Sequence, residues 1–176
     1  MKDLYILPEC YIDTNLVETL ISTEGCNHQK GCNTVVGKMD KLFADKFAVG
    51  IIDRDKRQVR YVNNFHEIIS TESLLLMKHN ERPHYLIMVS PAMDGFILKC
   101  ADEVQLKPED YGFPSDLKAF TTFTKSVTSK NASEFKKLFK DLRNASELKT
   151  LRGWLEYLRT NQYKSKEEDL KSMVSR

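Results

Sequence analysis

The sequence lacks the features of a membrane or secreted protein. No apolar run approaches the roughly 20 residues that a helix needs to cross a bilayer, and residues 1–5 lack the apolar core of a secretion signal. The apolar share of 41% and the charged share of 30% are those of an ordinary water-soluble chain. These absences predict a cytoplasmic protein without a membrane segment. A length of 176 residues suits one domain, or one domain with an appendage.

Cysteine is scarce, and no two cysteines have the C-x-x-C spacing of a structural zinc site. Cys26, His28 and Cys32 could offer two thiolates and an imidazole to zinc, but no obvious fourth ligand accompanies them. The favoured interpretation is a polar loop that contains reduced thiols.

The strongest local pattern is an uncharged apolar run, residues 47–52, that ends in Asp53-Arg54-Asp55. Such a run is typical of a strand buried on both faces of a parallel sheet. Binding sites of open α/β sheets lie beyond the carboxyl ends of the strands, where two carboxylates one residue apart can bind Mg²⁺. Asp53 and Asp55 are therefore candidate metal ligands, although a solvated turn would contain the same residues.

Glu9 is a second acid expected at that edge. It follows the apolar residues 4–7 and precedes a helix, for which positions 13–15 supply three N-cap candidates. If the two strands run parallel, Glu9 lies at the same edge of the sheet as Asp53. An acid ahead of a helix is also favoured by the helix dipole alone.

Asp94 is a third acid at the expected edge. Ser90-Pro91 predicts that a helix begins just after the apolar run of residues 85–89, and Asp94 falls in the first turn of that helix. A role as a metal ligand and a favourable position in the helix dipole both remain open.

Basic residues are concentrated near this edge and in the second part of the chain. Residues 1–113 hold 13 Lys/Arg against 17 Asp/Glu, whereas residues 114–176 hold 14 against 8. An acidic front and a basic back fit a metal site beside a surface that binds a polyanion, although Lys-rich helix faces that only maintain solubility would give the same imbalance. Three basic residues that follow the D-x-D motif are expected to contact nucleic acid or to balance the acids: Lys56, Arg57 and Arg60.

The remaining patterns predict a mixed sheet and a helical second part. Residues 74–77 and 85–89 flank a segment of turn composition, which predicts two antiparallel strands. A helix is expected over residues 33–45, whereas residues 58–73 give no decisive pattern. Proline and glycine at positions 108, 112 and 114 mark a linker, after which apolar stripes of helical spacing continue. The predicted organisation is an α/β domain over residues 1–106 and a basic helical appendage over residues 107–176.

The order of the acids resembles the Toprim domain of topoisomerases, primases and OLD-type and related nucleases. In that family one Glu follows the first strand and a D-x-D motif follows a later buried strand, as Glu9 and Asp53-Arg54-Asp55 do here. The similarity covers roughly residues 3–103, and residues 90–98 look like the strand-to-helix segment that carries a further acid in several of these nucleases.

The resemblance implies a fold and a set of roles. The fold would be α/β, with a small, mixed but mainly parallel sheet flanked by helices and a C-terminal helical appendage. Asp53 and Asp55 would bind metal, Glu9 would act in acid/base catalysis or bind metal, and Asp94 would be a further ligand. Two features depart from the family pattern: Cys10 stands where Gly is common, and the strand expected between the first helix and the D-x-D strand is absent or reduced to the region of Thr34.

Two functions follow as expectations. The first is an enzyme that uses Mg²⁺ or Mn²⁺ to process phosphodiester bonds, with nucleic acid held by the basic second part. The second is a non-catalytic, Toprim-like interaction module that binds a partner protein such as an ATPase. The chain has no G-x-x-x-x-G-K-[ST] motif of its own, so an ATPase would be a separate protein.

Overall fold

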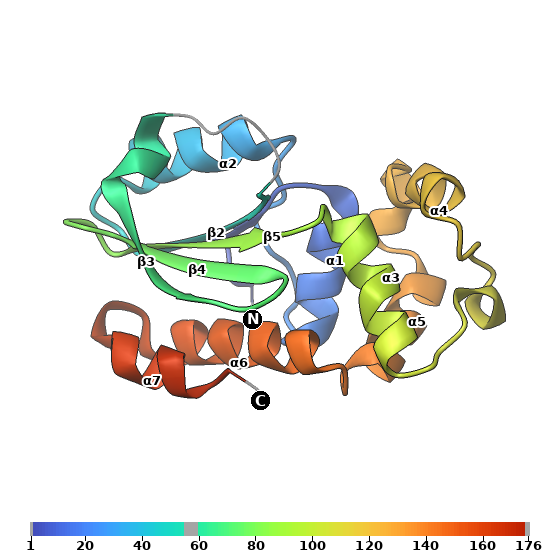
Figure 1. Ribbon diagram of the computed structural model, residues 1–176. Helices are drawn as coiled ribbons and strands as arrows, with labels where there is room; N and C mark the ends of the chain where they lie inside the picture. Colours follow the sequence, from blue (N-terminus) through green and yellow to red (C-terminus); the bar gives the residue numbers. More distant parts are fainter. Residues whose placement is uncertain (1, 55–59, 175–176) are drawn as a thin grey trace.

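The computed structural model describes residues 2–54 and 60–174. Five strands form one sheet in the order β1-β2-β5-β4-β3 (Figure 1). They are β1 (Ile6–Pro8), β2 (Ala48–Asp53), β3 (Phe65–Ser70), β4 (Leu74–His79) and β5 (His84–Val89). β1, β2 and β5 are parallel, whereas β4 is antiparallel to both β5 and β3.

The sheet is mixed, as expected, but it is not mainly parallel. β3, β4 and β5 are consecutive in the chain and are joined by short turns, and a short turn reverses the direction of the chain. The antiparallel pairings of β3 with β4 and of β4 with β5 therefore equal the parallel pairings in number among the described residues.

Helices cover both faces of the sheet (Figure 1). The seven α-helices of the described residues are α1 (Tyr11–Leu20), α2 (Cys32–Lys38), α3 (Met93–Glu103), α4 (Leu117–Thr124), α5 (Ser133–Leu142), α6 (Ser146–Asn161) and α7 (Glu167–Ser172). Five short turns of π- or 3₁₀-helix lie between these helices and strands: η1 (Met39–Phe43), η2 (Arg60–Asn64), η3 (Pro108–Tyr111), η4 (Val127–Lys130) and η5 (Gln162–Lys164). None of the helices in residues 2–54 and 60–174 is long and apolar enough to span a bilayer.

One face of the sheet is covered by α2 and η1. The alternation of side chains along β2 sends Ala48 and Ile52 into this layer. Gly50 points the same way, and a Cβ atom there would lie 2.6 Å from Sδ of Met39. Because real Cβ atoms do not approach so closely, the glycine allows η1 to pack directly against the strand.

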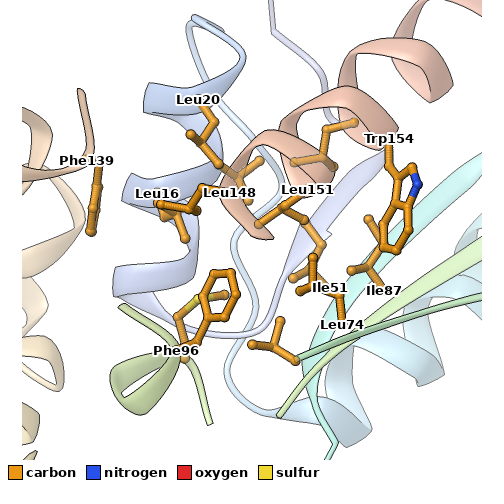
Figure 2. Close-up of a cluster of buried hydrophobic side chains, with 14 of the residues drawn as sticks. Leu16, Leu20, Ile51, Leu74, Ile87, Phe96, Phe139, Leu148, Leu151 and Trp154 are labelled. Atoms are coloured by element: carbon orange, nitrogen blue, oxygen red, sulfur yellow. The ribbon is translucent and has the colours of Figure 1, made fainter. Parts of the chain in front are cut away.

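The opposite face packs against α1, α3 and α6, and this core continues into the C-terminal part. Val49, Ile51 and Ile87 of the sheet share one cluster with α6, in which Trp154 is fully buried (Figure 2). Nε1 of Trp154 donates a hydrogen bond to the backbone oxygen of Leu170, 3.0 Å away, and so ties α6 to α7. The hydrophobic core is therefore continuous across the expected boundary between residues 106 and 107.

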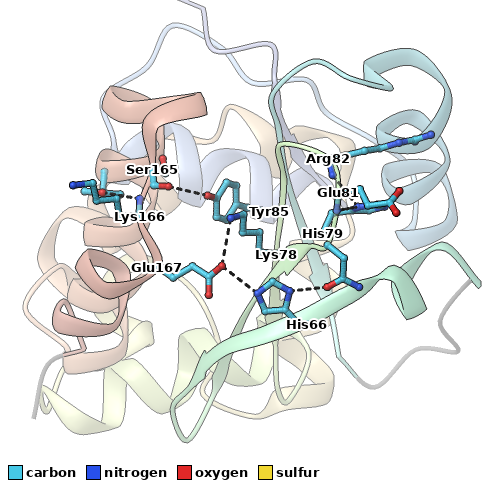
Figure 3. A network of polar contacts seen from close by, with 11 residues as sticks. His66, Lys78, His79, Glu81, Arg82, Tyr85, Ser165, Lys166 and Glu167 are labelled. Carbon is cyan, nitrogen blue, oxygen red and sulfur yellow. Dashed lines mark hydrogen bonds and ion pairs between the residues drawn. The ribbon is translucent and has the colours of Figure 1, made fainter.

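The end of the chain returns to the antiparallel edge of the sheet. Oε1 of Glu167 in α7 lies 3.1 Å from Nε2 of His66 in β3 and 3.4 Å from Nζ of Lys78 in β4 (Figure 3). At the other edge, Arg159 of α6 forms an ion pair of 3.0 Å with the buried carboxylate of Asp3. The C-terminal helices thus contact the sheet at both edges as well as across one face.

His84 starts β5 and is fully buried. Its Nε2 donates to the backbone oxygen of Lys46 at 3.0 Å, so Nδ1 must accept from the Tyr61 hydroxyl, which lies 2.7 Å away. Burial lowers the pKa of His84 from 6.5 to about 4. The fold therefore requires a neutral imidazole at this position.

We expect His84 to make stability depend on pH. Between about pH 4 and 6.5 the unfolded chain binds a proton that native His84 does not, so the free energy of unfolding rises with pH by about 3 kcal/mol across this window. The contribution is complete above pH 6.5 and is lost as pH falls. Urea unfolding at a series of pH values measures it. The His84→Gln variant should show a shallower pH dependence, and an unchanged slope would contradict the assignment.

Candidate active site

The carboxyl ends of β1 and β2 bring Glu9 to Asp53. Because these strands are parallel neighbours, the residue after β1 meets the last residue of β2. Oε2 of Glu9 accepts a hydrogen bond of 3.0 Å from the backbone N–H of Asp53, and both side chains are buried. Oδ1 of Asp53 accepts in turn from the backbone N–H of Met93, 3.1 Å away. The two acids thus connect β1, β2 and the start of α3.

Asp13 is a third acid of this cluster. Its side chain is 1% exposed, and it accepts two hydrogen bonds from Cys10: one from the backbone N–H at 3.1 Å and one from the thiol at 2.9 Å. Burial, together with the nearby carboxylates of Asp53 and Glu9, raises the pKa of Asp13 to about 7. The same burial, with the Asp13 carboxylate, raises the pKa of the Cys10 thiol, which therefore stays protonated and able to donate.

No site role was expected for Asp13. The first helix was predicted to begin near residues 13–15, whereas α1 begins at Tyr11 with Cys10 as its N-cap. Asp13 is then the third residue of the helix and turns back to the N-cap N–H, which is the acidic half of a capping box. Helical spacing gave no signal that Asp13 joins Glu9, because Glu9 precedes the N-cap and lies outside α1.

Asp94 lies beside Asp53 in a small pocket of about 190 Å³. Cys10 and Tyr11 from the start of α1 line the same pocket. Lys125, which directly follows α4, is also part of its wall, so the C-terminal part supplies a cation to the acidic edge. An anionic group that entered this pocket would meet Lys125 and the acids together.

The basic residues expected beside Asp53 are not gathered there by the described part of the chain. Asp55, Lys56 and Arg57 lie outside the described residues. Arg60 begins η2 and lines a pocket with the β4–β5 turn, at the opposite edge of the sheet. Arg60 was expected beside Asp53, whereas it lines this pocket with residues of the β4–β5 turn, at the end of the parallel strands away from Asp53.

Cys26, His28 and Cys32 do not converge. Cys26 is buried in the core of one sheet face and Cys32 in the core of the other. The ring of His28 stacks on Tyr11, with 4.4 Å between centroids, and its Nδ1 is 3.0 Å from the hydroxyl of Thr14. These positions agree with the favoured interpretation of a polar loop rather than with a zinc site.

In residues 2–54 and 60–174, no group of three or more His, Cys, Asp or Glu side chains is arranged to hold a metal ion. The carboxylates of Glu9, Asp13 and Asp53 accept backbone hydrogen bonds instead. Their chemistry still fits Mg²⁺ or Mn²⁺, because these ions take carboxylate oxygens and usually only one or two from the protein. Binding would require Asp53 to turn an oxygen toward the pocket that it already lines.

No family model matches the chain, and neither does a curated protein or a solved structure. The functional interpretation therefore rests on the residues and on the geometry of the site.

Proposed function

We propose that the chain is a Mg²⁺- or Mn²⁺-dependent enzyme that processes phosphodiester bonds of nucleic acid on a Toprim-like sheet. The observation that carries this proposal is the contact of Glu9 with Asp53 at the carboxyl edge of two parallel strands. Asp13 adds a third buried carboxyl to the same place, and its pKa is raised first by burial and then by the like charges of Asp53 and Glu9. A divalent cation near these groups would stabilise their charged forms.

Each acid has a distinct part in the proposed reaction. Asp53, with Asp55 of the same motif, would hold the cation, and Asp94 lines the pocket where a further ligand is needed. The bound cation would polarise the phosphoryl group and stabilise charge on the attacking and leaving oxygens. Glu9 would act as the acid or base, or would fix the end of β2 through the backbone N–H of Asp53. Lys125, which lines the same pocket, would contact a substrate phosphate.

Cleavage assays test this proposal. Single-stranded, double-stranded and nicked DNA and RNA are incubated with the protein in Mg²⁺, in Mn²⁺ and in a chelator. Activity should require the metal and should be lost in Asp53→Ala. It should persist in Asp102→Ala, which removes an exposed acid from α3. If the wild type and Asp53→Ala are equally inactive on every substrate, the enzyme proposal fails.

A non-catalytic interaction module is the second candidate, and one surface favours it. Three apolar side chains of α4 and η4 are unusually exposed: Leu117 (50%), Phe123 (46%) and Val127 (67%). Phe123 also lines an apolar hollow of about 510 Å³ with Phe113 and Phe135. Surfaces of this kind commonly bind proteins. Loss of binding to a candidate ATPase in Phe123→Ser, without any effect of metal on the melting temperature, would favour this function over catalysis.

A further inference from the structure

A second polar pocket lies at the amino edge of the parallel strands. It has a volume of about 530 Å³, and β2 and β5 separate it from the acid cluster by one strand length, roughly 17 Å. Three segments form its wall: the π-helical turn η1, the 3₁₀ turn η2, and the end of β4 with the turn to β5. Figure 3 labels His79, Glu81 and Arg82 of the last segment. The side chains that face the pocket are mainly hydrogen-bond donors, and the proposed catalytic function uses none of them.

The guanidinium of Arg82 is held by several contacts, all of which are made by Nη1. Its Nη1 contacts the backbone oxygen of Asp40 at 3.0 Å, the Asp40 carboxylate at 2.8 Å and the Tyr61 hydroxyl at 3.3 Å. The guanidinium also lies over the Tyr61 ring, 5.7 Å from its centroid. Tyr61 is itself fixed by its hydrogen bond to buried His84. Within the described residues, Nε and Nη2 of Arg82 form no hydrogen bond, so the remaining N–H groups of a rigidly held guanidinium are available.

His79 presents another donor to the same pocket. The backbone N–H groups of Glu81 and Arg82 both donate to its Nδ1, each at 3.1 Å, so the ring proton is on Nε2. His79 is 5% exposed and lines the pocket. Its Nε2–H is a donor from which an oxygen of a bound ligand could accept a hydrogen bond. Burial also lowers the pKa of His79, which keeps Nδ1 free to accept.

Arg60 and Asn80 complete the set of donors. The Arg60 side chain lines the pocket and makes no hydrogen bond or ion pair among the described residues. Asn80 lines the pocket with its side-chain amide 2.8 Å from Nδ1 of His66, and an amide N–H that does not contact His66 can donate to a ligand. Two carboxylates also line the pocket and would repel an anionic ligand. This repulsion is reduced because Asp40 is paired with Arg82 and Glu81 is exposed to solvent.

We propose that this pocket binds the phosphate group of a nucleotide-sized ligand, independently of metal and of the acid cluster. Two guanidinium groups and an imidazole N–H match the several oxygens of a phosphate, which Arg recognises through paired hydrogen bonds. The volume is in the range of small-molecule sites and accommodates the rest of a nucleotide. The phosphate belongs either to a free nucleotide or to a nucleic-acid strand, and the two sources share this chemistry.

Calorimetric titration in the presence of a chelator tests the proposal, with inorganic phosphate, adenosine 5′-monophosphate, adenosine and an oligothymidylate as probes. The monophosphate should bind at least about tenfold more tightly than adenosine, because the donors recognise the phosphate. A free nucleotide is the ligand if the monophosphate binds as tightly as the oligothymidylate per site. A strand is the ligand if the oligothymidylate binds more tightly and displaces the monophosphate.

Variants connect the binding to this pocket. Arg60→Gln and Arg82→Gln should each weaken monophosphate binding about tenfold to a hundredfold, the effect of removing a hydrogen bond to a charged group. His79→Asn keeps an acceptor for the two backbone N–H groups and loses the Nε2 donor, so it should weaken binding to a smaller extent. Arg143→Gln, which removes an exposed arginine that follows α5, and Asp53→Asn should change it by less than about twofold. Binding that is equal for adenosine and its monophosphate, or that survives Arg60→Gln in a folded protein, overturns the proposal.

Discussion

Replacing Trp154 with alanine is expected to lower the free energy of unfolding by about 3–5 kcal/mol, the cost of removing a large aromatic side chain from a packed interior. Trp154 is fully buried between α6 and the sheet, and it packs in the same cluster as Ile87 of β5 (Figure 2). The substitution also removes the indole donor of the Leu170 backbone oxygen, which keeps the N–H of Met173 at 3.4 Å. A loss of this size should lower the melting temperature by roughly 10 °C in a chain of this length.

The unfolding curves show whether the C-terminal part is independent of the sheet. Trp154 is the only tryptophan, so its fluorescence in the wild type reports on α6, whereas circular dichroism reports on the whole chain. A continuous core predicts that both signals change at the same denaturant concentration. Glu156→Ala, on the exposed side of the same helix, is the matched control and should change the stability by less than about 0.5 kcal/mol. Two separated transitions would show instead that residues 107–176 unfold as an appendage.

The parts of the fold that the sequence predicted are those in which local pattern and burial agree. The uncharged run of residues 47–52 forms β2 almost as expected, because β2 is buried along its whole length. Residues 74–77 and 85–89 form antiparallel strands, and the expected helix over residues 33–45 corresponds to α2 followed by η1. In contrast, β3 lies at an edge and alternates irregularly between buried and exposed side chains. A half-exposed edge strand with a bulge gives no clear period in the sequence, and residues 58–73 were therefore undecided.

In the candidate site, too, the sequence predicted only the positions that follow from a local pattern. Glu9 and Asp53 could be brought together from the sequence, because one rule about parallel strands determines where both residues lie. Asp13 was missed because its role depends on where α1 begins. With the helix start expected near residue 13, Asp13 would be an N-cap, whereas with the observed start at Tyr11 it is a buried acid of the first turn. Arg60 was expected beside Asp53 because it follows the D-x-D motif closely in the sequence. A short separation in sequence does not determine at which end of the strands a loop residue lies. The donors around His79 come from three separate segments, and only their packing in space gathers them.

Asp53→Asn is expected to abolish the proposed metal-dependent cleavage, with a fall of at least about a hundredfold in rate, because a carboxylate ligand of the cation is lost. Asparagine keeps an oxygen that can accept from the backbone N–H of Met93, so the connection between β2 and α3 survives. The variant therefore separates the charge of residue 53 from its structural hydrogen bond. Glu9→Gln likewise keeps an acceptor for the Asp53 N–H and removes only the charge and the acid/base group.

Melting in the presence of Mn²⁺ measures the binding step without any substrate. At about a hundredfold excess of ion over its Kd, binding to the native state adds about 2.7 kcal/mol, which corresponds to a rise of about 5–10 °C in Tm. Asp53→Asn should lose most of this rise, and Asp102→Asn should retain it. A full rise in Asp53→Asn would place the cation elsewhere, whereas a normal rise without cleavage in the wild type would support a metal-binding but non-catalytic site. Since Arg60 lies at the opposite edge from Asp53, Arg60→Gln should leave the rise unchanged.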